Sequence, residues 1–409
     1  MLQSLPLVFV LVGLALYTVL GGADFGAGFW QLFAGRGPRA EQVREHAHHS
    51  MAPVWEANHV WLVFVLTVFW TSYPRAFGSI ASTLGAALFV AALGIIFRGA
   101  AYALRAGAAG PRESALIDTV FSLSSILAPF ALGAAIGAIA TDRVPVGNAA
   151  GGLLSSWLNP TSIFIGVLAV VSCAYLAAVY LAADAARTGH AILVREFRAR
   201  ALGAGAVAGV LAVAGIFVVD ADRPHLFHSL LTGRSLAAVI VSAVAGAATL
   251  ALVARRRFEP ARYGAALAVA AIVAGLALAR WPTILPGLTV DRAAAGHDTL
   301  VWVVACVLGG GALLLPSLAL LFRLAVTGRF HGAEAARFED AGPGLRRVTS
   351  PSPVLVRAAI ACLAAGVVLL NVADAQWAHA VGVAGLVGFL VMAAGAIIPT
   401  ALGEQPYRR

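Results

Sequence analysis

Long apolar runs dominate this chain, and short polar stretches separate them. A helix that crosses a bilayer takes about 17–25 residues, so the length of each run is informative. Eleven runs reach that length, at residues 3–22, 57–74, 77–98, 116–140, 161–183, 201–219, 235–254, 263–280, 299–324, 354–373 and 378–400. The pattern predicts an all-α polytopic membrane protein with about eleven transmembrane helices.

Composition supports that class. The 409 residues are 60% hydrophobic and only 11% charged, whereas a soluble domain carries about 25% charged residues. The first run lacks a basic leader and a small-residue cleavage site, so we expect a retained helix rather than a signal peptide. Little chain remains for a soluble domain.

The distribution of charge predicts the orientation. All 28 basic residues are arginine, and 21 of them lie in the odd-numbered loops and the C-terminal tail, against six in the even-numbered loops. The positive-inside rule therefore predicts an N-terminus outside the cell and a C-terminus in the cytoplasm. No basic patch is interleaved with exposed aromatic residues, which argues against nucleic-acid binding.

The most informative polar stretch runs from Met51 to Trp61 and opens into the second apolar run. It places Glu56, flanked by Trp55 and Asn58, at the mouth of a predicted membrane helix. A charge at the centre of such a helix costs about 2.5–3.5 kcal/mol. A partner charge, a path to water or a function must offset that cost.

With this topology, four consecutive segments bring four charges to the cytoplasmic third of the membrane: Asp24, Glu56, Arg98 and Asp118. We expect the first helix to end near Asp24 and the fourth to begin near Asp118. Arg98 can pair with Glu56 or with either other acid, so at least one carboxylate is left without an ion partner and would either titrate or connect to water. The alternative is that these side chains extend to the headgroup level, as long charged residues often do.

Histidines provide weaker signals. His46, His48 and His49 fall in a predicted loop, where metal binding and a solvated interface are both open readings. His59 follows Asn58 and is a candidate for two roles, proton sensing and heme ligation. Since a heme between helices needs an axial ligand deep in a helix, and the deep stretches contain no histidine, we expect no heme in this chain.

Taken in order, five motifs resemble subunit II of cytochrome bd-type quinol oxidases, across residues 5–332. The motifs are Asp24-Phe-Gly-Ala-Gly28; Ala52-Pro-Val-Trp-Glu-Ala-Asn-His-Val-Trp61; Phe97-Arg98 with Arg105; Asp118 followed by Ser125, Pro129, Gly133 and Gly137; and Arg280-Trp-Pro-Thr-Ile-Leu-Pro286. The core of the second motif is the most specific single piece.

The resemblance implies two four-helix bundles plus a peripheral helix, in the cytoplasmic membrane of a bacterium. It implies a partner, subunit I, that carries the b hemes, heme d and the site for the quinol pool, while this chain binds no cofactor or metal except a possible structural quinone. It also implies that Glu56 is the carboxylate of a cytoplasmic proton path. Asp24 and Asp118 would belong to the same path or acid cluster, supported by Trp55, Asn58 and Arg98.

The chain departs from the family at several positions. An acid usually stands where this chain has Gly21, and Ala23, Ile117 and Ala138 replace other usual residues. Residues 1–332 form the predicted family domain and 333–353 a cytoplasmic linker. Residues 354–409 form an extra helical hairpin with a tail, which either packs on the lipid face or stands in for a small accessory subunit.

Two other functions remain open from the residues. A secondary transporter would use the same carboxylates as coupling sites, with helices broken near Pro129 and Pro316. A scaffold that has lost the proton path is the third possibility, because Gly21 replaces the usual acid.

Overall fold

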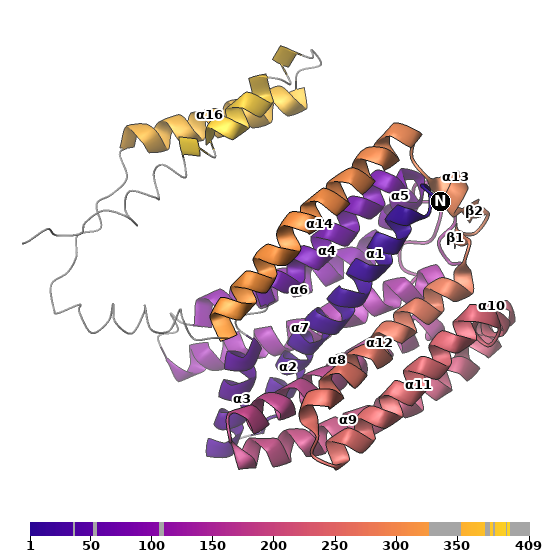
Figure 1. The fold of residues 1–409 in the computed structure, drawn as a ribbon, viewed down its shortest axis with the longest axis vertical. Helices are drawn as coiled ribbons and strands as arrows, with labels where there is room; N and C mark the ends of the chain where they lie inside the picture. The colour runs from indigo at the N-terminus through magenta and orange to yellow at the C-terminus, as the bar shows by residue number, and fades with distance from the viewer. Residues whose placement is uncertain are drawn as a thin grey trace, which may run out of the picture. The chain divides into compact units, whose positions relative to one another are not determined.

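The computed structural model describes residues 1–35, 37–51, 55–105, 110–326, 353–372, 377–378, 381–389 and 391–392, in two compact units, Met1–Leu314 and Leu315–Arg409. Figure 1 labels its helices. In the first half they are α1 (Leu5–Leu16), the π-helix η1 (Tyr17–Gly21), α2 (Gly22–Leu32), α3 (Pro38–Met51), α4 (Trp55–Ser72), α5 (Pro74–Thr83), α6 (Gly85–Arg105) and α7 (Pro111–Ala140). After them come α8 (Pro160–Arg187), α9 (Ala191–Asp222), α10 (Pro224–Leu230), α11 (Gly233–Ala254), α12 (Phe258–Arg280), α13 (Val290–Ala293), α14 (His297–Val326) and α16 (Pro353–Val372).

The all-α membrane fold class agrees with the prediction. Among the described residues, eight helices are long and apolar enough to cross a membrane, and Asn58–Ser72 and Arg357–Gly366 are shorter apolar helices. The total of eleven spans and the arrangement as two four-helix bundles stay predictions.

The first span differs from the prediction at its inner end. The helix does not stop near Asp24 but continues through η1 and α2 to Leu32. Small residues explain the error: Gly21, Gly22 and Gly26 suggest a loop, but they allow the helix to pack closely. A Cβ on Gly26 would overlap the carbonyl oxygen of Cys173 on α8. α6 ends later than predicted, at Arg105, and α7 begins earlier, at Pro111, so neither Arg98 nor Asp118 lies at a helix end.

The predicted histidine loop is a helix, α3. Its buried positions, Ala40, Val43 and Ala47, recur every three or four residues and form one face, as in an amphipathic helix. The opposite face carries charged residues, so the segment is too polar to resemble a membrane span. His46 lies on α3, whereas the side chains of His48 and His49 are outside the described residues.

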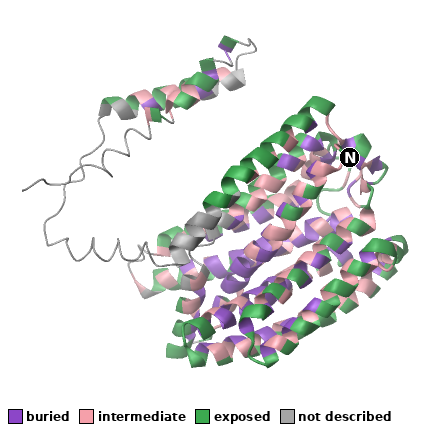
Figure 2. Cartoon of the chain, in the orientation of Figure 1, coloured by how far each residue is buried: buried purple, intermediate pink, exposed green. Residues whose placement is uncertain are grey.

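Within the first unit, α2, α7 and α8 pack against one another at the centre, and α8, α9, α11 and α12 form a ring in which each helix packs along two others. Figure 2 shows that buried residues concentrate on the inner helices, while the described part of α14 is mostly exposed. The exposed surface is apolar: Phe217, Val244 and Trp302 are all more than 60% exposed. Such a surface suits lipid rather than water.

A short hairpin connects α12 to α14 at one end of the unit. Strands β1 (Thr283–Leu285) and β2 (Leu288–Thr289) are antiparallel, and Arg280 precedes them. The Arg280 guanidinium donates to the Ala140 carbonyl at 2.8 Å and pairs with Asp142 at 2.8 Å. This arginine of the last sequence motif therefore ties the end of α12 to the end of α7.

The second unit contains two helical stretches that pack together, α16 and residues 381–389. A Cβ on Gly366 would lie 3.0 Å from the Gly382 carbonyl oxygen, and one on Gly385 would lie 3.1 Å from the Cys362 carbonyl oxygen. Because residue numbers rise on one helix as they fall on the other, the two run antiparallel. The residues predicted to form their turn, 373–376, and residues 333–352 of the predicted linker lie outside the described residues.

Candidate functional site

A buried ion pair joins α2 to α6. Arg98 binds Asp24 through both carboxylate oxygens, with Nη2 to Oδ1 at 2.6 Å and Nη1 to Oδ2 at 2.8 Å, and Nη2 also donates to the Asp24 backbone carbonyl at 3.2 Å. The two side chains are only 5% and 2% exposed. These are the only buried charged side chains among the residues that the structure describes.

Aromatic rings and a serine hold the guanidinium in place. Its carbon lies 5.0 Å from the centre of the Phe25 ring and 4.6 Å from that of Phe121. Its Nε donates to Ser125 Oγ at 3.0 Å, and Ser125 donates to the Phe121 carbonyl at 2.7 Å. Ser125 fits against α2 only because residue 28 is glycine, since a Cβ there would overlap the serine oxygen. Gly28, Ser125 and Arg98, which come from three separate sequence motifs, thus meet at one contact between α2, α6 and α7.

The pair dominates the local energetics. Taking both charges out of water costs several kcal/mol per ion, which the close bidentate geometry must offset. Removing one partner alone would leave an unpaired buried charge, at a cost of about 3–5 kcal/mol. The Asp24–Arg98 pair is therefore a requirement of the fold, whatever chemistry it also supports.

Helix α4 brings the second motif to this pair. Asn58 is buried and donates to the Leu20 carbonyl, inside the π-helix, at 3.3 Å. The Asn58 side chain also hydrogen-bonds to the Asp24 carboxylate. Trp55 and Glu56 occupy the first turn of α4, and their side chains lie outside the described residues.

Asp118 belongs to a separate site. It pairs with Arg105, Nη1 to Oδ1 at 3.3 Å, and both side chains are about a quarter exposed. Asp118 precedes Ser125 by seven residues on α7, which is about 10 Å along a helix. The sequence placed all four charges at one depth and gave Arg105 only as part of a motif, not as the partner of Asp118, because the third span was expected to end at Arg98. The structure places Asp24 and Arg98 in a dry pair and Asp118 in a partly exposed pair with Arg105.

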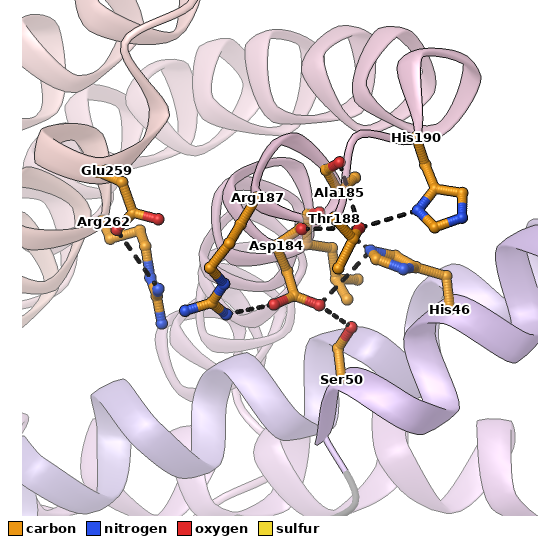
Figure 3. Close-up of polar contacts among 10 residues, drawn as sticks. His46, Ser50, Asp184, Ala185, Arg187, Thr188, His190, Glu259 and Arg262 are labelled. Atoms are coloured by element: carbon orange, nitrogen blue, oxygen red, sulfur yellow. Dashed lines mark hydrogen bonds and ion pairs between the residues drawn. The ribbon is translucent and has the colours of Figure 1, made fainter. Parts of the chain in front are cut away.

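A third polar site, centred on Asp184, was not predicted from the sequence and is drawn in Figure 3. At the end of α8, Asp184 accepts a hydrogen bond from Ser50 at 2.5 Å and pairs with Arg187. His46 Nε2 lies 3.2 Å from the Leu181 carbonyl oxygen and 4.0 Å from Asp184 Oδ2. The cluster fastens α3 to α8, just before the chain enters α4. The only sequence signal was an acid and an arginine three residues apart at the end of an apolar run.

The contact between α7 and α8 leaves no room for a heme between these two helices. The helices α2, α7 and α8 approach one another at backbone distance: a Cβ on Gly133 would lie 3.0 Å from the Gly166 Cα, and one on Gly137 would lie 2.8 Å from the Ser162 Cα. A porphyrin between these helices would have to separate them. Among the described residues, no group of three histidine, cysteine or acidic side chains is arranged to hold a metal ion.

Comparison with known proteins gives three findings. A sequence profile described as cytochrome bd terminal oxidase subunit II matches residues 2–325. The chain is 26% identical over 132 residues to cytochrome bd ubiquinol oxidase subunit 2 of Bacillus subtilis (strain 168), covering 32% of this chain and 38% of that protein. It is 25% identical over 130 residues to cytochrome bd-I ubiquinol oxidase subunit 2 of Escherichia coli (strain K12), covering 31% and 34%.

A solved structure also resembles this fold. A chain in the structure of bd oxidase from Geobacillus thermodenitrificans superposes with a TM-score of 0.64 and 24% identity, covering 80% of this chain and 99% of that one. The structural likeness shows a shared fold. The matched stretches span only about a third of the length of the two sequence relatives, so they support the family assigned by the profile and say nothing of the rest of the chain.

Proposed function

This chain belongs to the cytochrome bd terminal oxidase subunit II family, and from that premise we propose that it is the non-heme subunit of a bacterial quinol:oxygen oxidoreductase. The proposed reaction oxidises two quinols and reduces one dioxygen to two waters. The four protons released by quinol on one side are matched by four taken up from the cytoplasm to make water.

The work is divided between two subunits in this proposal. The b and d hemes of subunit I supply electron transfer and oxygen reduction. This chain supports the heme-bearing partner across the bilayer and contributes a route for cytoplasmic protons. The backbone-close packing of α8 against α2 and α7 supports that division, because it leaves no space for a heme at those two contacts.

The buried Asp24–Arg98 pair is the observation that carries the proton-path proposal. It is made of family-motif residues, and it lies beside Asn58, two residues after Glu56. We assign proton relay to Glu56, because a carboxylate can accept and release a proton when water reaches it. Asp24 and Arg98 provide a fixed, neutral pair beside the relay, and Asp118 with Arg105 provides an acid at the partly exposed end.

Orientation and partners follow the same proposal. The N-terminus lies outside and the C-terminus in the cytoplasm, as the arginine distribution predicts. The arginine-rich ends of α8, α9, α11 and α12 then face the cytoplasm. Subunit I is the principal partner, and the quinol pool is reached through it. The C-terminal hairpin stands in for a small accessory subunit, and a structural quinone remains part of the proposal.

The transporter alternative gains no support from the helices. It called for helices broken near Pro129 and Pro316, in the manner of alternating-access carriers. Both prolines lie inside continuous helices, α7 and α14. The buried charge pair is also saturated by its own hydrogen bonds, which leaves it poorly suited to binding and releasing a substrate ion.

The test is to purify the chain from native membranes through a C-terminal tag and record a reduced-minus-oxidised spectrum. We expect co-purification of a second large subunit and a far-red heme d band, with quinol-driven oxygen uptake. A well-expressed chain that purifies alone and colourless would overturn the oxidase assignment.

A further inference from the structure

Arg200, on α9, lies at the boundary between the protein interior and the exposed apolar surface. Its side chain is partly buried, and its Nη1 has no hydrogen-bond partner among the described residues. The guanidinium carbon lies 5.2 Å from the centre of the Trp30 ring and 5.3 Å from that of Phe197. Trp30 is itself fixed, because its Nε1 donates to the Ala174 carbonyl at 2.7 Å. Arg200 is thus held in position by rings rather than by an acid.

The two rings do not satisfy this guanidinium. It carries several N–H donors and no acceptor, and an aromatic face attracts its charge without replacing the acceptors around its edge. In the described part of the chain, no carboxylate pairs with Arg200. Glu196, one turn earlier on α9, pairs with Arg39 of α3 instead. Arg39 and Arg200 lie close enough for their charges to repel each other, so two cations share one carboxylate and the cluster favours an anion.

The surface that continues from Arg200 along α9 is apolar. Gly203, Val207 and Val210 are exposed and recur every three or four residues, so they form one stripe of the helix. Val207 is 50% exposed and Val210 is 68% exposed. Arg200 lies at the edge of this stripe, between it and the buried face that contains Phe197. A cation at the end of an exposed apolar stripe matches a molecule that has an anionic head and hydrocarbon chains.

We propose that Arg200 and Arg39 bind the phosphate of an anionic phospholipid, whose acyl chains lie along the stripe of Gly203, Val207 and Val210. Arginine suits this role because its planar group binds phosphate through paired N–H donors. Basic pockets between membrane helices on the cytoplasmic side are typical sites for such headgroups, and this end of α9 faces the cytoplasm in the orientation proposed above. The site depends on the membrane class of the chain and not on the oxidase assignment.

The first test uses the unmodified full-length protein, with any subunit that purifies with it. It is placed in phosphatidylcholine nanodiscs that contain a trace of phosphatidylglycerol or of phosphatidylcholine, each with a photoactivatable acyl chain. After illumination, mass spectrometry measures the labelling of residues 203–210. We expect labelling by phosphatidylglycerol to be about fivefold stronger, the preference that one arginine near an anionic lipid supplies. Equal labelling by the two lipids would overturn the proposal.

Inorganic phosphate separates a lipid site from a general anion site. The labelling by phosphatidylglycerol is repeated with an excess of inorganic phosphate in the buffer. We expect it to stay almost unchanged, because the acyl chains keep the lipid in the bilayer beside the stripe. Loss of the phosphatidylglycerol preference in phosphate would overturn the lipid assignment and identify a site for soluble anions.

The second test compares Arg200→Gln with Arg195→Gln. Both variants remove one charge from α9, but Arg195 is exposed. We expect Arg200→Gln to lose the preference of about fivefold and Arg195→Gln to retain it. Arg200→Lys keeps the charge and should retain part of the preference, which separates the loss of charge from the loss of packing against Trp30 and Phe197. An equal loss in Arg195→Gln and Arg200→Gln would indicate diffuse surface charge and overturn the site. If the variants of Arg200 do not fold, the labelling of the unmodified protein decides.

Discussion

The two halves of the membrane domain bury different chemistry. Residues 1–140 enclose an ion pair and the amides of Gln31 and Asn58, whereas the polar side chains buried in the described part of residues 160–314 carry hydroxyls, on serine, threonine and Tyr175. The second half fills its interior with small apolar side chains, such as Ala177, Ala182 and Ala265, which are fully buried. Both halves are equally apolar outside, so hydropathy alone does not distinguish them.

The two halves therefore suit different roles: the first maintains buried charges, and the second provides close packing. Close alanine packing gives the second half tight contacts and few alternatives, as dense interiors do. The first half accepts desolvated charges, whose geometry must be maintained by several helices at once. We therefore expect substitutions to act through electrostatics in the first half and through volume in the second.

The largest expected effect comes from breaking the ion pair. Arg98→Gln leaves the Asp24 carboxylate buried without its partner, so we expect a loss of about 3–5 kcal/mol in stability and little assembled complex. The yield of heme-containing complex and its thermal unfolding midpoint measure this. The double variant Asp24→Asn with Arg98→Gln should recover part of the yield, because no charge is then left unpaired. A double variant worse than Arg98→Gln would contradict the pairing argument.

The next effect is on turnover. Glu56→Gln keeps the side chain's shape but cannot exchange a proton, so we expect quinol-driven oxygen uptake to fall by roughly two orders of magnitude with heme content preserved. Glu259→Gln, an exposed acid on α12, is the control and should retain full rate. Unchanged turnover in Glu56→Gln would remove the proton role, and loss of heme would make Glu56 a structural residue.

In the second half, volume should matter more than charge. Ala182→Leu adds three carbons to a fully buried position on α8, and overpacking of this kind costs about 1–3 kcal/mol. Ala186→Leu, four residues further along and exposed, should be close to neutral. The two thermal unfolding midpoints test the contrast directly; equal midpoints would mean that the interior of this half is looser than its burial implies.

The smallest effect is expected at the partly exposed pair. Arg105→Gln removes the partner of Asp118, but a pair about a quarter exposed is screened by water and contributes at most about 1 kcal/mol. The unfolding midpoint should therefore change little, in contrast to Arg98→Gln. A shift as large as that of Arg98→Gln would show that Asp118 and Arg105 are shielded in the assembled complex.

The membrane class and the approach of Asp24 to Arg98 were accessible from sequence because both depend on hydropathy and span length. Asp24 and Arg98 were placed near each other correctly, on helices that the apolar runs identified. The sequence did not show that Arg98 pairs with Asp24 rather than with another acid. That pairing depends on Gly28 and Ser125 meeting across two helices, which no periodicity encodes.

The missed features share a cause. The end of the first helix, the helical form of α3 and the Asp184 cluster all lie where apolar runs give way to mixed sequence. There the structure is decided by packing against a distant element: Gly26 against Cys173, Val43 within the core, and Ser50 against Asp184. Local patterns become uninformative where tertiary contacts decide.

The contact between Gly26 and the Cys173 carbonyl limits how the subunit can move. Two helices locked backbone to backbone cannot slide or rotate past each other without breaking the contact along its length. Whatever cycle of protonation this subunit undergoes must then run through side-chain rotamers and solvent within a stationary frame. Under the proposed function, we therefore expect α2 and α8 to keep their relative position during turnover.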